Sequence, residues 1–282
     1  MNKFTKIICN LLKVVFLIGV LVISIFPILY IILASFKSNA EILTLGANIF
    51  PKEFSAENYI KAWELANFKL YTWNSIYMSF FIVIGSIVTS TILAYVFDRG
   101  VFIGKKFIFS MFLSTMFIAL GTSSLFPQLQ VAKFLGIHRS LWGVIAVRVL
   151  GINVSLVFVA KSFLATIPKE IDEAAKIDGC GFIGIYSRII FPVLKPLIAT
   201  IGLLSFRGAW NDYLLPLVFT LTTPEKSPLI VGVINLMNTG ESASSWNLML
   251  AATTIAIVPM LLVYLFLNKY FISGLMNGAV KG

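Results

Sequence analysis

Long apolar runs constrain the fold of this chain more than any other feature. Six stretches, each roughly 20 residues long, contain few charged residues. They lie at about 14–35, 74–97, 107–127, 141–164, 197–220 and 249–271. A helix of roughly 20 apolar residues crosses the hydrocarbon core of a bilayer, and it pairs its own backbone polar groups where no water can reach them. The sequence therefore predicts an all-α polytopic membrane protein with six transmembrane helices.

Composition excludes several other classes of protein. Of the 282 residues, 59% are hydrophobic and only 12% are charged, whereas a soluble domain has about 25% charged residues. The net charge of +10 is scattered between apolar runs rather than gathered in the patch that nucleic-acid binding needs. Cys9, Cys180 and His138 are the only cysteines and histidine, too few for a disulfide framework or a Cys/His metal cluster. We expect no nucleic acid partner and no metal.

The distribution of lysine and arginine predicts the orientation in the membrane. Six spans place both termini on one side, where thirteen lysines and arginines lie outside the spans, against seven on the other side. The positive-inside rule then makes both termini cytoplasmic in a multi-pass protein of the cell membrane. We expect a cytoplasmic segment 1–13, a transmembrane domain 14–271 and a cytoplasmic tail 272–282. The first span is too long for the apolar part of a signal peptide, so we interpret it as a retained anchor.

The first long loop, about 36–73, is expected outside the cell. Its segment Ser55 to Ala66 predicts a short helix capped by the Ser55 hydroxyl. The helix is either an ordered linker at the membrane surface or a docking site for a partner.

The second long loop, about 165–196, is expected in the cytoplasm. Pro168 suits a first helical turn, acidic residues follow it near the positive end of the helix dipole, and Gly179 lies where a helix commonly ends. The spacing also allows surface ion pairs four residues apart, Lys169 with Glu173 and Asp172 with Lys176. The segment 167–179 therefore predicts a short helix.

One face of this short helix is small and nearly flat. Ile171, Ala174, Ala175 and Asp178 follow the spacing of a single helical face. Two interpretations remain open: the face inserts into a groove of a partner, or it folds back on the membrane domain of its own chain.

The residues from Glu173 to Pro192 follow the spacing E-A-A-x3-G-x9-I-x-L-P, with Phe191 in place of leucine. This segment resembles the EAA loop of the permeases of ABC importers. Segments 127–141, 209–216 and 274–282 resemble the carbohydrate branch of the same family. The resemblance covers about residues 10–282.

The resemblance implies a type I ABC importer permease fold, with the EAA helix as a cytoplasmic coupling helix seated in a cleft of a separate ATPase. It also implies a second homologous permease, two cytoplasmic ATPase subunits and an extracellular sugar-binding protein. ATP and magnesium would bind to the ATPase subunits, so this chain holds no cofactor and is not an enzyme. The expected coupling residues are Glu173, Ala174, Ala175, Asp178, Gly179, Pro192 and Lys281.

Two glycine-containing segments imitate nucleotide-binding motifs. Gly179, Gly181 and Gly184 spell G-x-G-x-x-G, but that motif requires a strand before it and a helix after it in a βαβ unit. Segment 100–106 differs from a phosphate loop in its spacing and in having lysine where serine or threonine binds magnesium. Any energy from ATP therefore comes from another polypeptide.

Ionisable residues within membrane spans are costly and suggest function. Arg207 and Asp212 lie about 140° apart on an ideal helix, poorly placed to pair with each other. Each is expected to face the pore or the other permease, or to be neutralised by polar groups of a neighbouring helix. Arg148 lies near the end of its span and is expected to reach the interface. The residues expected along a translocation path are Gln128, Arg207, Trp210, Asn211 and Asp212.

The predicted function is that of a permease subunit of an ATP-driven sugar importer. The alternatives are an ABC permease for a non-sugar solute, and a self-sufficient secondary transporter, for which an internal repeat of spans is expected. Arg207 raises a further choice. Facing the pore, it would suit an acidic sugar; held by an acidic or carbonyl partner, it would accompany a neutral oligosaccharide.

Overall fold

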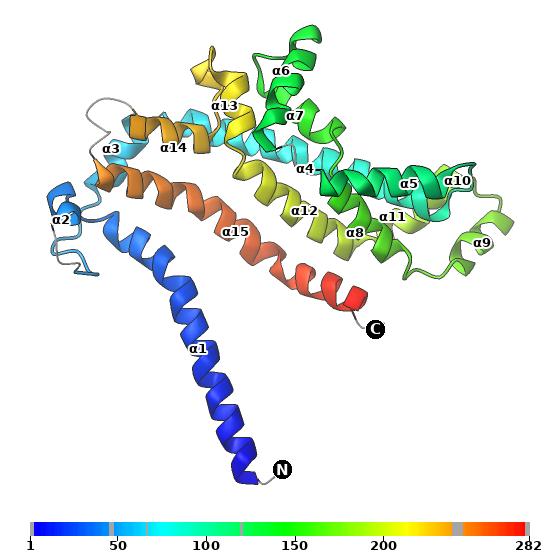
Figure 1. Cartoon of the computed structure of the whole chain (residues 1–282), viewed down its shortest axis with the longest axis horizontal. Helices are drawn as coiled ribbons and strands as arrows, with labels where there is room; N and C mark the ends of the chain where they lie inside the picture. The colour runs from blue at the N-terminus through cyan, green and yellow to red at the C-terminus, as the bar shows by residue number, and fades with distance from the viewer. Residues whose placement is uncertain (1–2, 45–47, 66, 119–120, 239–244, 280–282) are drawn as a thin grey trace. The chain divides into compact units, whose positions relative to one another are not determined.

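The computed structural model describes residues 3–44, 48–65, 67–118, 121–238 and 245–279, and within these ranges its elements are all helical (Figure 1). The α-helices are α1 (Lys3–Ala34), α2 (Asn39–Leu43), α3 (Glu57–Leu65), α4 (Phe68–Arg99), α5 (Lys105–Ser114), α6 (Leu125–Phe134), α7 (Leu141–Leu150), α8 (Val154–Leu164), α9 (Glu170–Ile177), α10 (Phe182–Ile185), α11 (Phe191–Val193), α12 (Lys195–Trp210), α13 (Leu214–Thr220), α14 (Leu229–Asn238) and α15 (Trp246–Ala279). Short 3-10 turns (Thr115–Phe117, Gly121–Ser124 and Pro224–Lys226) and one π-helical turn (Tyr186–Ile190) complete the chain.

Three described helical segments are long and apolar enough to cross a membrane: Ile8–Ala34, Phe68–Arg99 and Trp246–Leu267. Two bent pairs raise the number to five if each pair forms one span. The pair α7 and α8 bends by 46°, and the pair Phe182–Val193 and α12 bends by 79°. The expected all-α membrane architecture is confirmed, whereas the count of six spans stays a prediction.

The third apolar run, 107–127, is not one helix in the described residues. Helix α5 ends at Ser114, and 3-10 turns precede α6, with Ile118 extended and Gly121 in the left-handed region at φ 54°. Hydropathy measures how apolar a segment is but does not report whether its backbone remains helical.

The fourth and fifth runs are also broken, so continuous helices over 141–164 and 197–220 were wrong expectations. Between α7 and α8, Ile152 has a positive φ of 37°, and the Asn153 side chain caps α8 by accepting from the Leu156 amide at 3.3 Å. Residues 211–213 separate α12 from α13. The expected loop 165–196 is partly helical, because Phe182–Val193 is helical and pairs with α12.

The chain forms two compact units: residues 1–68 with 232–258, and residues 69–231 with 259–282. In the first unit, Asn58 of α3 donates to the carbonyls of Ser35 and Lys37 and accepts from the Asn247 amide at 2.7 Å. The amide of Glu57 donates to the Ser55 hydroxyl at 3.3 Å. The helix predicted in the loop 36–73 is confirmed, beginning at Glu57, whereas its location outside the cell stays a prediction.

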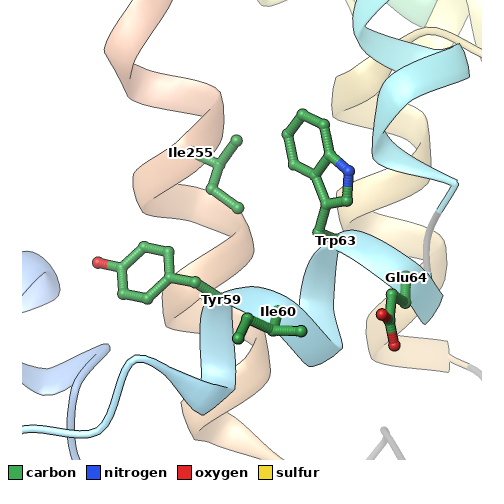
Figure 2. A pocket seen from close by; sticks show the side chains of 5 residues that line it. All are labelled: Tyr59, Ile60, Trp63, Glu64 and Ile255. Carbon is green, nitrogen blue, oxygen red and sulfur yellow. The ribbon is translucent and has the colours of Figure 1, made fainter.

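An open groove of about 370 Å³ lies between α3 and α15 in the first unit (Figure 2). Its lining is Tyr59, Ile60, Trp63, Glu64 and Ile255. The Tyr59 hydroxyl is 2.5 Å from that of Ser35, and the Trp63 ring stacks on Phe68. Both aromatic side chains therefore have structural partners within their own unit.

Two buried cores lie in the part of the second unit that the structure describes. The first includes Ala94, Tyr95, Leu164, Ala175 and Ile185, from α4, α8, α9 and α10. The second joins α4, α7 and α13 and includes buried Met78, Val144 and Phe219. In Figure 1, α9 lies at one end of this unit, and α6 and α13 lie away from it. The two regions of functional interest are therefore separate.

Candidate functional site

Helix α9 ends where the sequence predicts, through a Schellman motif. The Gly179 amide donates to the Lys176 carbonyl at 3.0 Å, and the Cys180 amide donates to the Ala175 carbonyl at 2.9 Å. This motif needs a left-handed residue, and Gly179 has φ 82°. Gly181 is the N-cap of α10. Two glycines of the apparent dinucleotide motif therefore delimit helices.

The face of α9 that looked single in the sequence is divided in the structure. Asp172 and Ala175 are buried against the same chain, whereas Ala174 and Asp178 are exposed. Ile177 is 88% exposed, so the outer side also carries an apolar side chain. The interpretation that the helix folds back on its own chain holds for one side, whereas insertion of the exposed side into a partner stays a prediction.

A buried ionic cluster fixes the inner side of α9. The Arg99 Nε lies 2.9 Å from Asp172 Oδ2, with the two side chains 6% and 7% exposed. The expected surface pairing of Asp172 with Lys176 was therefore wrong, because Asp172 turns inward. Arg99 Nη1 donates to Asp98 at 2.8 Å, and Nη2 donates to the Ile167 carbonyl at 2.7 Å.

Two lysines join further elements to this cluster. Lys105, the first residue of α5, donates to the carbonyls of Asp98 and Gly100 at 2.9 and 2.8 Å. These carbonyls lie at the C-terminal end of α4, where a cation is favourable. Lys161 of α8 lies 3.8 Å from Asp98 Oδ1. Helices α4, α5, α8 and α9 therefore meet at one charged cluster.

The remaining expected coupling residues lie in two places. Glu173 is exposed on α9, and Pro192 is exposed in α11. Lys281 lies outside the described residues.

A polar cavity of about 410 Å³ lies in the second unit, near the break between α12 and α13. Gln128, Asn211 and Asp212 line it, as three of the residues expected on a translocation path. Thr122, Ser124, Arg148 and Tyr213 also contribute to its wall. Amide, hydroxyl and guanidinium groups therefore gather around one hollow.

An ion pair across two helix breaks forms part of this wall. Arg148 Nε donates to Asp212 Oδ2 at 2.7 Å, and Arg148 Nη2 lies 2.5 Å from the same oxygen. Arg148 is thus paired within the chain, and its reach to the membrane interface stays a prediction. Arg148 was not among the residues expected on the translocation path. The signal that could have found it is its positive charge within one apolar run, opposite to the negative charge of Asp212 within another.

Arg207 and Trp210 are not among the residues that line the cavity. Trp210 is buried and stacks with Phe206, their ring centroids 5.3 Å apart. Arg207 is exposed, and its carbonyl accepts from the Asn211 side-chain amide at 3.0 Å. Asp212 pairs with Arg148, in agreement with the poor geometry expected between Asp212 and Arg207.

Long apolar helices, bent helix pairs and a polar hollow with a paired charge are features of a polytopic membrane protein. The chain belongs to the family of binding-protein-dependent transport system inner membrane components, whose model matches residues 2–276. It is therefore a multi-pass component of a transport system in the inner membrane.

Individual relatives agree with this family. The chain is 34% identical to the melibiose/raffinose/stachyose import permease protein MelC of Bacillus subtilis, over 83% of this chain and 84% of that protein. It is 32% identical to the galactooligosaccharides transport system permease protein GanQ of the same organism, over 93% and 92%. A chain from the crystal structure of a bacterial ABC transporter that imports the acidic polysaccharide alginate shares the fold, with a TM-score of 0.82 and 23% identity, over 96% of this chain and 99% of that one.

Proposed function

We propose that this chain is a permease subunit of an ATP-driven importer of sugars or oligosaccharides and forms half of the translocation pathway. The observation that carries the proposal is helix α9. It bears the EAA spacing, presents one side outward and is fixed on the other side to α4 by a buried ion pair. A helix with one anchored side and one free side is suited to receiving a force from a partner.

The partner on the free side of α9 is a cytoplasmic ATPase, present as two subunits. Exposed Glu173, Ala174 and Asp178 contact it, and Gly179 ends the helix so that it can enter a cleft. ATP and magnesium bind to those subunits and not to this chain, which is non-catalytic. In this arrangement both termini, 1–13 and 272–282, are cytoplasmic, and an extracellular sugar-binding protein delivers the solute on the other side of the domain 14–271.

A second, homologous permease completes the pathway. Support comes from α1, in whose most apolar 18-residue stretch no residue is buried within the chain. Such a helix needs apolar surroundings on all sides, which membrane lipid and a second permease supply.

Sugars are the solute class that the cavity and the relatives favour. Sugar hydroxyls both donate and accept hydrogen bonds, which matches the amide and hydroxyl groups of Gln128, Asn211 and Thr122. The charge of Asp212 is balanced by Arg148. These features favour a neutral oligosaccharide. The alternative is an acidic sugar. It would be supported if Arg207→Leu reduced uptake far more than it reduced assembly.

The test is reconstitution of the complete complex from this chain, a second homologous permease, the ATPase and the binding protein. We expect ATP-dependent uptake of a radiolabelled oligosaccharide in the presence of the binding protein, and no ATP hydrolysis by the permease pair alone. Ala174→Arg should abolish uptake while the permease still inserts, whereas Ala56→Arg, exposed at the start of α3, should not. Uptake by this chain alone would support a secondary transporter, and uptake of only a non-sugar solute would support the other ABC alternative.

A further inference from the structure

We propose that Arg99 and Asp172 are positioning residues that transmit the movement of α9 to α4. The inference rests on the proposed function, since it assumes that an ATPase moves α9. It assigns the transmission to one polar stripe of α4, formed by Thr91, Tyr95 and Arg99. These residues are spaced four apart, so they lie along one side of the helix over successive turns.

All three members of the stripe hold the segment that contains α9 and the helical turns after it. Thr91 Oγ1 lies 2.8 Å from the Tyr186 hydroxyl, and the Tyr95 hydroxyl donates to the Phe182 carbonyl at 3.2 Å. The Tyr95 ring also packs on Phe182, with centroids 4.5 Å apart. Arg99 completes the stripe at the end that faces α9.

Arg99 provides the contact that resists displacement most strongly. Its three guanidinium nitrogens have different partners: Nε faces Asp172 within α9, Nη2 holds the Ile167 carbonyl before α9, and Nη1 holds Asp98. A guanidinium is planar, so these partners fix the orientation of the side chain as well as its position. A lysine has a single charged nitrogen and cannot hold them in that arrangement.

Burial makes the connection between Arg99 and Asp172 costly to break. Both side chains are more than nine-tenths buried, and separating them would leave the Asp172 carboxylate without its cation in a poorly solvated site, whereas Arg99 would keep Asp98. The neighbouring apolar contact is different, because buried Ala175 offers only a methyl group to the core. Apolar packing is non-directional and can slide, whereas the Arg99 guanidinium is held by its hydrogen bonds to Asp98 and the Ile167 carbonyl while its Nε faces Asp172. A push on α9 therefore reaches α4 mainly through Arg99.

The test compares three conservative variants in the complete reconstituted complex: Asp172→Glu, Asp172→Asn and Arg99→Lys. Asp172→Glu keeps the charge but changes the length of the connection, so it separates positioning from charge compensation. The control is Glu57→Gln in α3, which breaks the exposed pair with Lys61, 2.7 Å apart. The hydrogen bond and charge of Lys61 lower the pKa of Glu57, and this exposed pair lies outside the stripe.

The readouts are the amount of ATPase that co-purifies with the permease, basal ATP hydrolysis, and the stimulation of hydrolysis by solute-loaded binding protein. We expect all three variants to retain the ATPase and basal hydrolysis and to lose stimulation by about tenfold, within the usual range of coupling between sites. Glu57→Gln should match the wild type in every readout.

The alternative outcomes are distinct. Wild-type stimulation in assembled Asp172→Glu and Arg99→Lys complexes would overturn the inference and leave the proposed function intact. Failure of all three variants to assemble would make the pair a structural requirement and would also overturn it. A wild-type complex that binds no ATPase or shows no stimulation would overturn the proposed function, and the inference with it.

Discussion

The two buried aspartates of the second unit, Asp172 and Asp212, are equally enclosed but have different partners. Asp172 and its partner Arg99 are 7% and 6% exposed, whereas Asp212 is 7% exposed and its partner Arg148 is 46% exposed. The first pair is closed among helices α4, α5, α8 and α9. The second is open toward a polar cavity.

This difference in exposure indicates different roles: the closed pair connects two helices, whereas the open pair is placed to meet a solute. A closed pair cannot exchange its partner for water, so it holds two helices at a fixed distance. An open pair can rearrange when a solute enters, because its guanidinium is already partly hydrated. We therefore expect changes at Arg99 to alter coupling to ATP, and changes at Asp212 to alter the handling of the solute.

Removing the closed cation should have the largest effect. Arg99→Met leaves Asp172 buried without its cation, which costs about 3–5 kcal/mol when a buried pair loses one partner. We expect a large decrease in the melting temperature of the purified complex and a low yield. Lys61→Met, which breaks an exposed pair, is the control and should leave both unchanged. Equal melting temperatures for the two variants would contradict the closed character of the first pair.

Removing the open charge should have a smaller effect of a different kind. Asp212→Asn weakens a charged hydrogen bond, at a cost of about 1.5–3 kcal/mol, but Arg148 can turn toward solvent. We expect a change in KM for the solute, with the stimulation of ATP hydrolysis per bound solute retained. Steady-state uptake over a range of solute concentrations measures this. A loss of stimulation with an unchanged KM would remove the distinction between the two pairs.

The position of the open pair depends on close packing of α7 against α13. A Cβ added at Gly143 would lie 2.2 Å from the Ile137 carbonyl oxygen and 2.8 Å from the Phe219 ring. Gly143→Ala should therefore cost about 1–3 kcal/mol through overpacking. Because α7 also carries Arg148, the KM for the solute should change as it does in Asp212→Asn. Gly208→Ala in α12, where nothing lies within 4 Å, is the control and should keep the wild-type melting temperature.

The end of α9 should give the smallest effect. Gly179 has φ 82° with nothing within 4 Å of an added Cβ, so Gly179→Ala costs only the left-handed conformation, about 1–2 kcal/mol. Gly181→Ala, at φ −74°, is the matched control without that strain. We expect weaker retention of the ATPase on purification with Gly179→Ala alone. The same retention in both variants would show that the helix end does not affect docking.

Local sequence signals predicted α9 well. Pro168, the acidic first turn and Gly179 act within one helical turn, so neighbouring residues suffice to predict where the helix lies. They did not predict which side is buried. Asp172 seemed to belong to a surface pair with Lys176, and Ala175 to a docking face, because periodicity gives angles around one helix and not what packs against it.

The sequence by itself determined that this is a helical membrane protein, because 59% hydrophobic residues arranged in long runs have no stable alternative in water. It also determined the likeness to a permease family, through the spacing from Glu173 to Pro192. Only the tertiary structure decided where the apolar runs break and which charges meet. The pairs of Arg99 with Asp172 and of Arg148 with Asp212 join residues 73 and 64 positions apart. Such contacts depend on how separate helices pack, and no local pattern of residues encodes that.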